Sequence, residues 1–164
     1  MILDMASSQI TWGDLLVAKN EKKQIKAGVA IDSLGEITTD PAKVTEGGGL
    51  LPFFGHKGSG LAFVVELLAG ALTGSRVGND VPGGWGSFYI LLDPTMFRPL
   101  PEFTSDVGRA IKELKNAPKA KGFIEVFFAG EQSSNLRDKH LADGFFDVSD
   151  NLYQSLMKIL KSTR

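Results

Sequence analysis

The pattern of hydrophobic positions predicts one almost wholly apolar helix near the middle of the chain. Residues 61–72 present apolar side chains on every face apart from Glu66, and a helix that is hydrophobic all round is normally buried on most sides. Gly74 follows two residues later, and glycine is the residue type that most often ends a helix as a C-cap. We therefore expect a buried helix over residues 61–72, around which the other elements are arranged.

A glycine-rich loop leads into this helix and contains a candidate ligand site. Gly55, Gly58 and Gly60 allow the backbone to approach a ligand closely, while the amides at a helix start and the Lys57 ammonium both attract an anion. No acidic residue lies within several positions of Lys57. A tightly packed loop, or a turn that needs positive φ, would also place glycines here. We interpret the loop as a phosphate-binding site and keep tight packing as the alternative.

The loop does not match either standard glycine-rich fingerprint. The Walker A motif places its lysine after the last glycine, whereas Lys57 precedes Gly58. The dinucleotide fingerprint needs a strand immediately before it, and the Leu-Leu-Pro sequence at residues 50–52 makes a poor strand. An ordinary Rossmann site is therefore not expected.

Shorter patterns predict the elements on the N-terminal side of the loop. Ser7 or Ser8 can cap a helix that extends to about Lys22. Residues 29–35 predict a short strand that ends in an Asx-type turn. The Asp-Pro pair at residues 40–41 predicts one short helical turn with proline at its first position. Together these elements form a connector ahead of the apolar helix.

The C-terminal half predicts a loop followed by strands and helices. Residues 76–86 are dense in glycine, proline, asparagine and aspartate, which marks a mobile or ligand-facing loop. Residues 85–92 and 123–128 are apolar runs that predict buried strands. The predicted helices are an amphipathic surface helix over residues 102–116, a helix capped at Ser133 or Ser134, and a final helix over residues 150–161.

The composition is that of an ordinary soluble globular protein. Of the 164 residues, 43% are hydrophobic and 23% charged, with a net charge of −1, which predicts one domain over residues 1–164. Such a charge balance offers no attraction to nucleic acid or an anionic membrane. The absence of cysteine excludes disulfides, thiolate catalysis and cysteine metal ligands. The N-terminal residues lack a signal-peptide pattern and the run at 61–72 is too short to span a bilayer, so we expect a cytoplasmic protein with no nucleic-acid or membrane partner.

The two histidines do not form a recognisable catalytic or metal-binding group. His56 lies in the glycine loop, where it either contacts phosphate or caps a turn, and His140 is most simply a solvated helix residue. Neither has a nearby carboxylate in the sequence to orient it, although alcohol oxidation needs a base within hydrogen-bond reach of the hydroxyl. No HExxH motif or carboxylate–histidine cluster is present. We therefore assign no catalytic residue and no metal ligand.

Four segments in order resemble one enzyme family: DMASSQITWG, TTDP, LLPFFGHKGSGLAFVVELLAGALTG and FFAGEQ. The chain resembles the type 2 malate/L-lactate dehydrogenases, also described as sulfolactate dehydrogenase-like oxidoreductases, over essentially its whole length. The resemblance implies an α/β subunit with a non-Rossmann dinucleotide-binding fold, in an intertwined homodimer. It also implies NAD or NADP as cofactor and hydride transfer between the nicotinamide and a small-molecule 2-hydroxy acid or 2-oxo acid.

The same resemblance implies a set of cofactor-binding residues. They comprise an N-terminal segment along the dinucleotide, the glycine loop at its phosphates and a later turn that closes over it: Asp4, Met5 and Ala6; His56, Lys57 and Gly58; Gly130 and Glu131. Two of these positions have structural alternatives. Asp4 could cap a helix through its carboxylate, and Glu131 could serve a structural role at a strand end.

The sequence also departs from the family pattern. Family members have an upstream Arg-Gly-hydrophobic-Ser-His-Gly segment and a second histidine that exchanges the proton, and neither has a counterpart in these residues. We therefore interpret residues 1–164 as the C-terminal part of a larger subunit, truncated at the N-terminus and inactive without the N-terminal half. The alternative is a non-catalytic nucleotide- or phosphate-binding module, or a partner subunit of a split enzyme.

Overall fold

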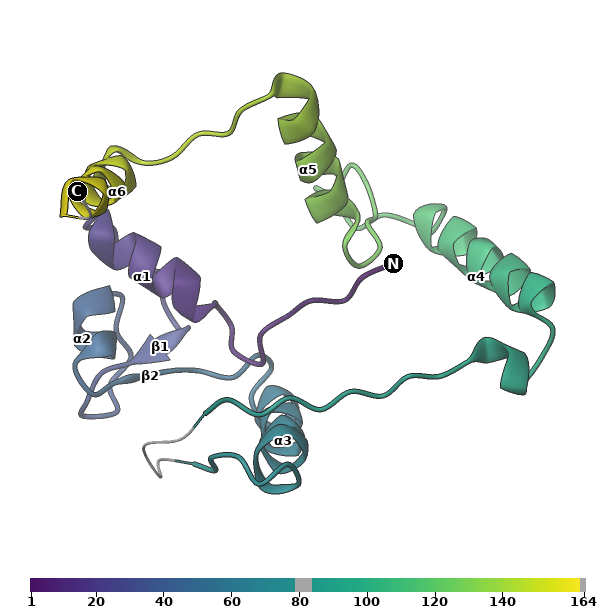
Figure 1. Ribbon diagram of the computed structural model, residues 1–164, viewed down its shortest axis with the longest axis horizontal. Coiled ribbons are helices and arrows are strands. Elements are labelled where there is room, and N and C mark those ends of the chain that lie inside the picture. Colours follow the sequence, from purple (N-terminus) through teal and green to yellow (C-terminus); the bar gives the residue numbers. More distant parts are fainter. Residues whose placement is uncertain (79–83, 163–164) are drawn as a thin grey trace. The chain divides into compact units, whose positions relative to one another are not determined.

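A computed structural model describes residues 1–78 and 84–162, in which helices predominate (Figure 1). Its elements are α1 (Trp12–Asn20), β1 (Ala30–Ile31), α2 (Pro41–Thr45), β2 (Gly49–Leu50), α3 (His56–Val65) with a π-helical continuation (Glu66–Ala71), a 3₁₀ turn (Pro94–Met96), α4 (Leu100–Lys115), α5 (Glu131–Asp143) and α6 (Asp150–Ser162). The chain divides into two units. The α3 unit contains Met5–Tyr89 and Val148–Arg164, and the α4–α5 unit contains Met1–Asp4 and Ile90–Asp147.

The core of the α3 unit is small and lies between α1, α2 and the two strands. Its fully buried side chains are Leu15, Val29, Ala30 and Val44, with Ile10, Ile25 and Leu50 packed against them. Strand β1 pairs antiparallel with β2, which places Ala30 opposite Leu50 and Ile31 opposite Gly49. Burial of these few side chains holds the connector segments together, because removing apolar surface from water is the main favourable term in folding.

Local signals in the connector are largely confirmed. The Asp32 carboxylate accepts a hydrogen bond from the Leu34 amide at 2.9 Å, which forms the expected Asx-type turn after β1. Asp40 caps α2 by accepting from the Ala42 amide at 2.9 Å. The predicted start of the first helix at Ser7 or Ser8 is wrong, because Thr11 and Asp14 form a capping box there and α1 begins at Trp12.

The apolar helix begins earlier than predicted and is not buried on most sides. Among residues 56–71, only Gly58 and Gly70 are buried. The Phe63 side chain is 64% exposed. The prediction of a buried helix over residues 61–72 is therefore wrong for this chain, since the large apolar side chains of Leu61, Phe63, Val64, Val65, Leu67 and Leu72 are each at least 42% exposed. Leu72 is the C-cap of the π-helical stretch, and Gly74 adopts φ 70° two residues later, so the helix ends just before the glycine that was predicted to cap it.

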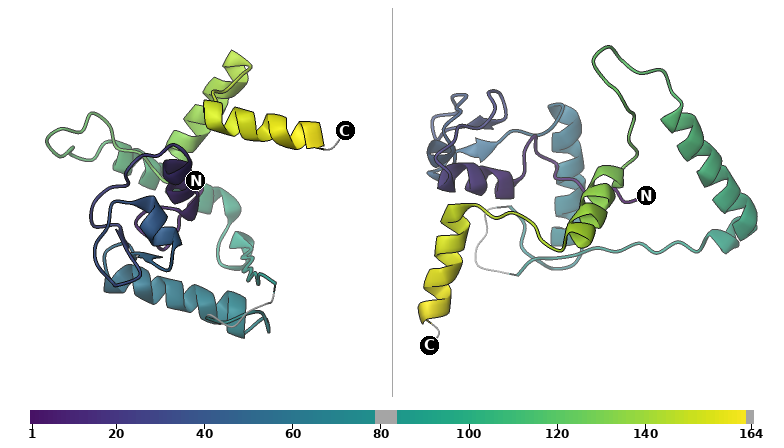
Figure 2. Two further views of the ribbon diagram at one scale, coloured as in Figure 1. Left: turned by 90° about the vertical axis from the view of Figure 1, so that its left-hand side faces the viewer. Right: turned by 90° about the horizontal axis from the view of Figure 1, so that it is seen from above.

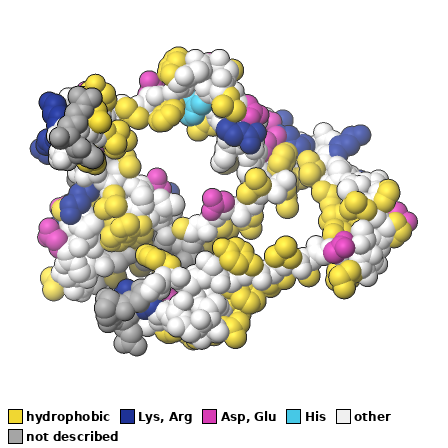
Figure 3. Space-filling model, in the orientation of Figure 1, with side chains coloured by type: hydrophobic (Ala, Val, Ile, Leu, Met, Phe, Trp, Pro, Cys, Tyr) yellow, Lys and Arg dark blue, Asp and Glu magenta, His cyan; other side chains and the backbone are white. Residues whose placement is uncertain are grey.

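The two predicted buried strands are not formed. Residues 84–92 and 117–130 follow an extended or irregular course without ladder partners among the described residues (Figure 2). Ile124 is 92% exposed and the Trp85 side chain is fully open to solvent. Hydrophobic side chains are consequently exposed to solvent along several segments of the face drawn in Figure 3. Apolar composition alone does not create a strand, because each strand needs a neighbour for its backbone hydrogen bonds.

The remaining helices are confirmed with one change in boundary. Helix α4 matches the predicted 102–116 segment and α6 matches the predicted 150–161 segment. Helix α5 begins at Glu131 after Gly130 rather than behind a serine cap, so Ser133 and Ser134 lie in its first turns. Of the predicted loop 76–86, residues 79–83 lie outside the described residues. No helix among the described residues is long and apolar enough to cross a membrane.

Truncating the core should destabilise the α3 unit. Leu15 is 0% exposed, and replacing a buried leucine by alanine costs about 2–5 kcal/mol of unfolding free energy. We expect Leu15→Ala to lower the urea midpoint clearly in circular dichroism. Leu34→Ala is the control, because Leu34 is 85% exposed. Equal midpoints for the two variants would contradict this core.

Candidate functional site

The turn into α3 depends on two consecutive residues with positive φ. Phe54 adopts φ 46° and Gly55 adopts φ 59°, which redirects the chain after residue 53 into the helix. Gly58 is buried in the first turn, and a Cβ there would overlap the carbonyl oxygen of Phe53 and lie 2.9 Å from that of Ser7. Tight packing therefore explains the glycine at position 58, whereas a Cβ at Gly60 would meet open space.

Three of the first four amides of α3 have acceptors within the loop. The Lys57 amide donates to the Phe54 carbonyl at 3.4 Å, the Gly58 amide to Phe53 at 3.0 Å and the Ser59 amide to Gly55 at 3.1 Å. These three amides are therefore not free for a ligand in this conformation. The expectation that the first amides of the helix help to hold a phosphate is therefore wrong for these three, which leaves the Lys57 ammonium and the helix dipole to attract an anion.

Lys57 is an exposed cation in the first turn of α3, where the helix dipole disfavours a positive charge. Its side chain has no ion-pair partner among the described residues, and the first turn of α3 contains no acidic residue. A positive charge near a helix N-terminus is disfavoured by the helix dipole, whereas an anion is favoured there. A bound anion would thus interact favourably with both the helix start and Lys57. His56, the first residue of α3, is also exposed.

Met5 and Ala6 lead directly into the chain that packs beside the α3 loop. The Phe53 amide donates to the Ser7 carbonyl at 3.1 Å, and the Gln9 amide donates to the Leu51 carbonyl at 2.9 Å. These bonds hold residues 7–9 antiparallel to residues 51–53. Both Met5 and Ala6 are exposed. The α3 unit therefore contains five of the predicted cofactor residues: Met5 and Ala6 come immediately before the antiparallel contact, and residues 56–58 follow it after an interval of two residues.

Asp4 and Gly130 line the same pocket in the α4–α5 unit. The Ile2 amide donates to the Ala129 carbonyl at 3.0 Å, and a pocket of about 250 Å³ lies beside this contact. It is lined by Ile2, Asp4, Gly130, Ser133, Ser134 and Arg137. The structural alternative for Asp4 is wrong, because Thr11 caps the next helix. Gly130 adopts φ 87°, and a Cβ there would lie 2.7 Å from the Ile2 carbonyl oxygen, so this position requires glycine.

Glu131 has structural partners. One carboxylate oxygen accepts from Lys115 Nζ at 2.8 Å and the other from the Phe128 amide at 3.1 Å. The hydrogen bond from Lys115 holds the pKa of Glu131 below its ordinary value, and the hydrogen bonds to Glu125 and then Glu131 raise the pKa of Lys115. Glu131 therefore closes the turn at the start of α5.

The histidines do not form an acid–base pair with a carboxylate. The His140 ring lies 6.0 Å from the Phe146 ring, centroid to centroid. No hydrogen bond joins either histidine to a carboxylate in the part of the chain that the structure describes. Among the same residues, no group of three or more histidine, aspartate or glutamate side chains is placed to hold a metal ion.

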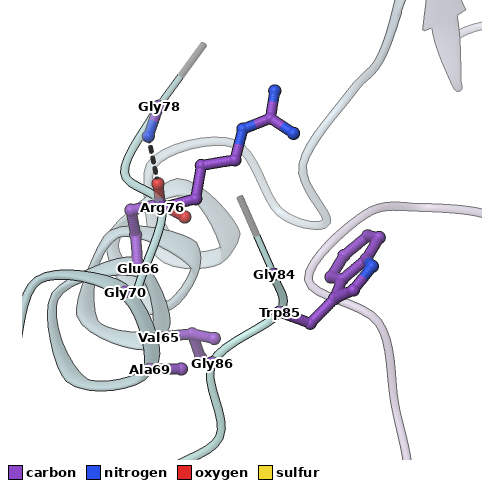
Figure 4. A pocket seen from close by; sticks show the side chains of 9 residues that line it. All are labelled: Val65, Glu66, Ala69, Gly70, Arg76, Gly78, Gly84, Trp85 and Gly86. Atoms are coloured by element: carbon purple, nitrogen blue, oxygen red, sulfur yellow. Dashed lines mark hydrogen bonds between the residues drawn. The ribbon is translucent and has the colours of Figure 1, made fainter. Parts of the chain in front are cut away.

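A second pocket, not foreseen from the sequence, lies along the π-helical stretch (Figure 4). Its volume is about 420 Å³, and its lining residues are Val65, Glu66, Ala69, Gly70, Arg76, Gly78, Gly84, Trp85 and Gly86. The Glu66 carboxylate accepts a hydrogen bond from the Gly78 amide. Glu66 is the single carboxylate in an otherwise apolar helix, and this was the sequence feature that could have indicated the pocket. Its hydrogen bond connects the loop after the helix to the helix itself.

Comparison with known proteins identifies the family. The sequence profile of the malate/L-lactate dehydrogenase family matches residues 1–157. L-sulfolactate dehydrogenase of Methanocaldococcus jannaschii is 39% identical over 165 residues, which cover 96% of this chain and 46% of that protein. Ureidoglycolate dehydrogenase (NAD(+)) of Escherichia coli O157:H7 is 28% identical over 166 residues, with 96% of this chain and 46% of that protein covered.

The solved structures agree with the sequence relatives. The chain superimposes on sulfolactate dehydrogenase from Methanocaldococcus jannaschii with a TM-score of 0.75 and 35% identity, over 98% of this chain and 47% of the other. The chain therefore belongs to the malate/L-lactate dehydrogenase family, and the predicted α/β dehydrogenase fold is confirmed at that level. It spans about half the length of the relatives it matches.

Acid should weaken the Lys115–Glu131 pair. Because the folded pKa of Glu131 is lowered, its stabilising contribution is present above the unfolded value of ~4.3 and is lost as the pH falls through the folded value. We expect the melting temperature to fall further for wild type than for Glu131→Gln between about pH 7 and about pH 3. Glu113→Gln is the control, because Glu113 lies on α4 without an ion pair in the described residues. Parallel curves for wild type and Glu131→Gln would contradict the pairing.

Proposed function

We propose that residues 1–164 supply the dinucleotide-binding part of an oxidoreductase that acts on a small 2-hydroxy acid or the corresponding 2-oxo acid. Family membership supports this proposal, and so do relatives named for sulfolactate and for NAD(+)-dependent ureidoglycolate oxidation. The observation on which it rests most directly is the unpaired Lys57 cation at the start of α3. When bound, NAD or NADP would accept or donate the hydride.

Each of the two units supplies some of the residues that we propose to contact the cofactor. Lys57 binds a phosphate oxygen of the dinucleotide, with His56 and Gly58 beside it, and Met5 and Ala6 lie along the cofactor from the adjoining segment. Asp4, Gly130 and Glu131 contribute from the pocket and turn of the α4–α5 unit. A dinucleotide phosphate fits best at Lys57, where an anion would offset the unfavourable placement of a cation at a helix N-terminus.

These residues do not by themselves provide the proton transfer. Oxidation of a hydroxyl needs a base in hydrogen-bond reach, and neither histidine is oriented by a carboxylate within the described residues. We propose that the chain forms one domain, the C-terminal part of a larger non-Rossmann subunit in the cytoplasm. Association with an N-terminal half and a second subunit would bury apolar side chains such as Trp85 and Ile124, which are now open to water.

A second candidate function is a non-catalytic nucleotide- or phosphate-binding module, or a partner subunit of a split enzyme. The absence of a carboxylate-oriented histidine among the described residues favours this alternative. An adjacent reading frame that encodes the Ser-His-Gly segment would favour a split or interrupted enzyme. Without such a frame, the binding module becomes the better description.

A polypeptide of these 164 residues should show no dehydrogenase turnover by itself. Loss of a general acid or base usually costs ~10²–10⁴ in rate, and loss of substrate positioning costs more. The assay follows NADH and NADPH absorbance with malate, lactate, sulfolactate and ureidoglycolate. Turnover by a pure preparation, free of host dehydrogenases, would overturn this prediction.

Lys57→Ala should weaken dinucleotide binding. A charge-assisted hydrogen bond to phosphate is worth ~1.5–3 kcal/mol, which corresponds to roughly 10- to 150-fold in affinity. Lys57→Arg should lose less, because it keeps the charge but changes the reach and geometry. Titration of NADH and NADPH by calorimetry or fluorescence measures the affinities, and high salt should weaken wild type more than Lys57→Ala.

The matched control is Lys26→Ala, which removes an exposed lysine of the same unit that has no ion pair in the described part of the chain. It should bind NADH as wild type does. Equal affinities for wild type and Lys57→Ala, in samples shown to be folded, would leave tight packing as the explanation of the glycine loop.

A further inference from the structure

Lys115 connects the end of α4 to Glu125 and to Glu131 within the α4–α5 unit. It is the last residue of α4, and its ammonium lies 2.6 Å from Glu125 Oε1 and 2.8 Å from Glu131 Oε1. It also lies 5.1 Å from the centroid of the Phe127 ring, within the range of a cation–π contact. Only 27% of the side chain is exposed. One cation therefore contacts both ends of the segment from residue 125 to residue 131.

The carboxylate of Glu131 transmits this contact to the backbone of the turn. Its second oxygen accepts from the Phe128 amide at 3.1 Å, while the Glu131 amide donates to the Phe128 carbonyl at 3.1 Å. The turn between Phe128 and Glu131 is thus closed by the side chain and the backbone of one residue. Gly130, at φ 87°, lies inside this turn.

The pocket that contains Asp4 is built on the same turn. The Ala129 carbonyl accepts from the Ile2 amide at 3.0 Å, and Gly130 lines the pocket together with Asp4. Movement of the turn would therefore change the positions of Asp4 and Gly130, two of the predicted cofactor residues.

Removing the Lys115 charge should open the turn. Glu125 and Glu131 each lie within hydrogen-bond distance of one nitrogen, so their carboxylates are close neighbours that the ammonium neutralises. Without the ammonium, two like charges would repel each other across the segment. The Glu131 carboxylate would then move towards water and release the Phe128 amide.

We propose that Lys115 is a positioning residue that holds the Phe128–Glu131 turn in the arrangement that binds the dinucleotide. The proposal rests on the proposed function. Lys115 acts through Glu131 and need not touch the cofactor. Nothing in its sequence neighbourhood marks it, because its two carboxylate partners are 10 and 16 residues away.

The test combines affinity and hydrogen exchange on the full chain. Lys115→Met keeps the apolar stem and removes the charge, whereas Lys115→Arg keeps the charge. Lys112→Met is the control, because Lys112 lies on the same helix, is exposed and has no ion pair in the described residues. NADH titration gives the affinity, and exchange mass spectrometry follows the peptide that covers residues 128–134.

We expect Lys115→Met to weaken NADH binding at least about 10-fold, because the loss of an internal charge-assisted hydrogen bond lowers the population of the binding-competent turn by about that factor. Exchange in residues 128–134 should become faster in the same variant. Lys115→Arg should recover most of both properties, and Lys112→Met should match wild type. Recovery by arginine distinguishes a requirement for the charge from a general loss of packing.

Three results would overturn the inference. Unchanged exchange in Lys115→Met would show that Lys115 does not hold the turn. Faster exchange with unchanged NADH affinity would show that the turn lies outside the cofactor site. If wild type itself fails to bind NADH, the proposed function fails and the binding role with it, while the exchange comparison still reports whether Lys115 holds the turn.

Discussion

The close backbone contact between residues 7–9 and 51–53 is the constraint on which the candidate site in the α3 unit depends. Two hydrogen bonds hold these segments antiparallel, and the buried Gly58 lets the start of α3 pack against both. Any side chain at position 58 would collide with the backbone. Because the contact lies between Met5–Ala6 on one side and Lys57 on the other, it sets the spacing of the residues proposed to bind the cofactor.

Charge acts differently in the two units. In the α3 unit, Lys57 stands exposed at a helix start without an acidic partner among the described residues, so an external anion would interact favourably with it. In the α4–α5 unit, Lys115 is fully engaged by two carboxylates and an aromatic ring. The first lysine fits a ligand contact and the second fits an internal support. Their environments, rather than the residue type, distinguish the two roles.

Sequence reasoning succeeded where a signal is contained in a few neighbouring residues. The Asx-type turn at Asp32 and the short helical turn opened by the Asp-Pro pair at residues 40–41 each depend on contacts within about four residues, and each was confirmed. It failed for residues 85–92 and 123–128, whose apolar composition was interpreted as buried strands. A strand requires a partner from elsewhere in the chain or from another chain, and composition does not supply one.

The sequence by itself therefore determined the family, the amphipathic helices α4 and α6, and the candidate cation at Lys57, because motifs and helical periodicity are local properties of the chain. The tertiary structure alone decided that the Lys57, Gly58 and Ser59 amides are already hydrogen-bonded, that Asp4 and Gly130 line one pocket, and that Lys115 contacts Glu131. Each of these facts depends on how the backbone turns or brings distant residues together. Such contacts are set by packing and backbone geometry, which no short stretch of sequence specifies.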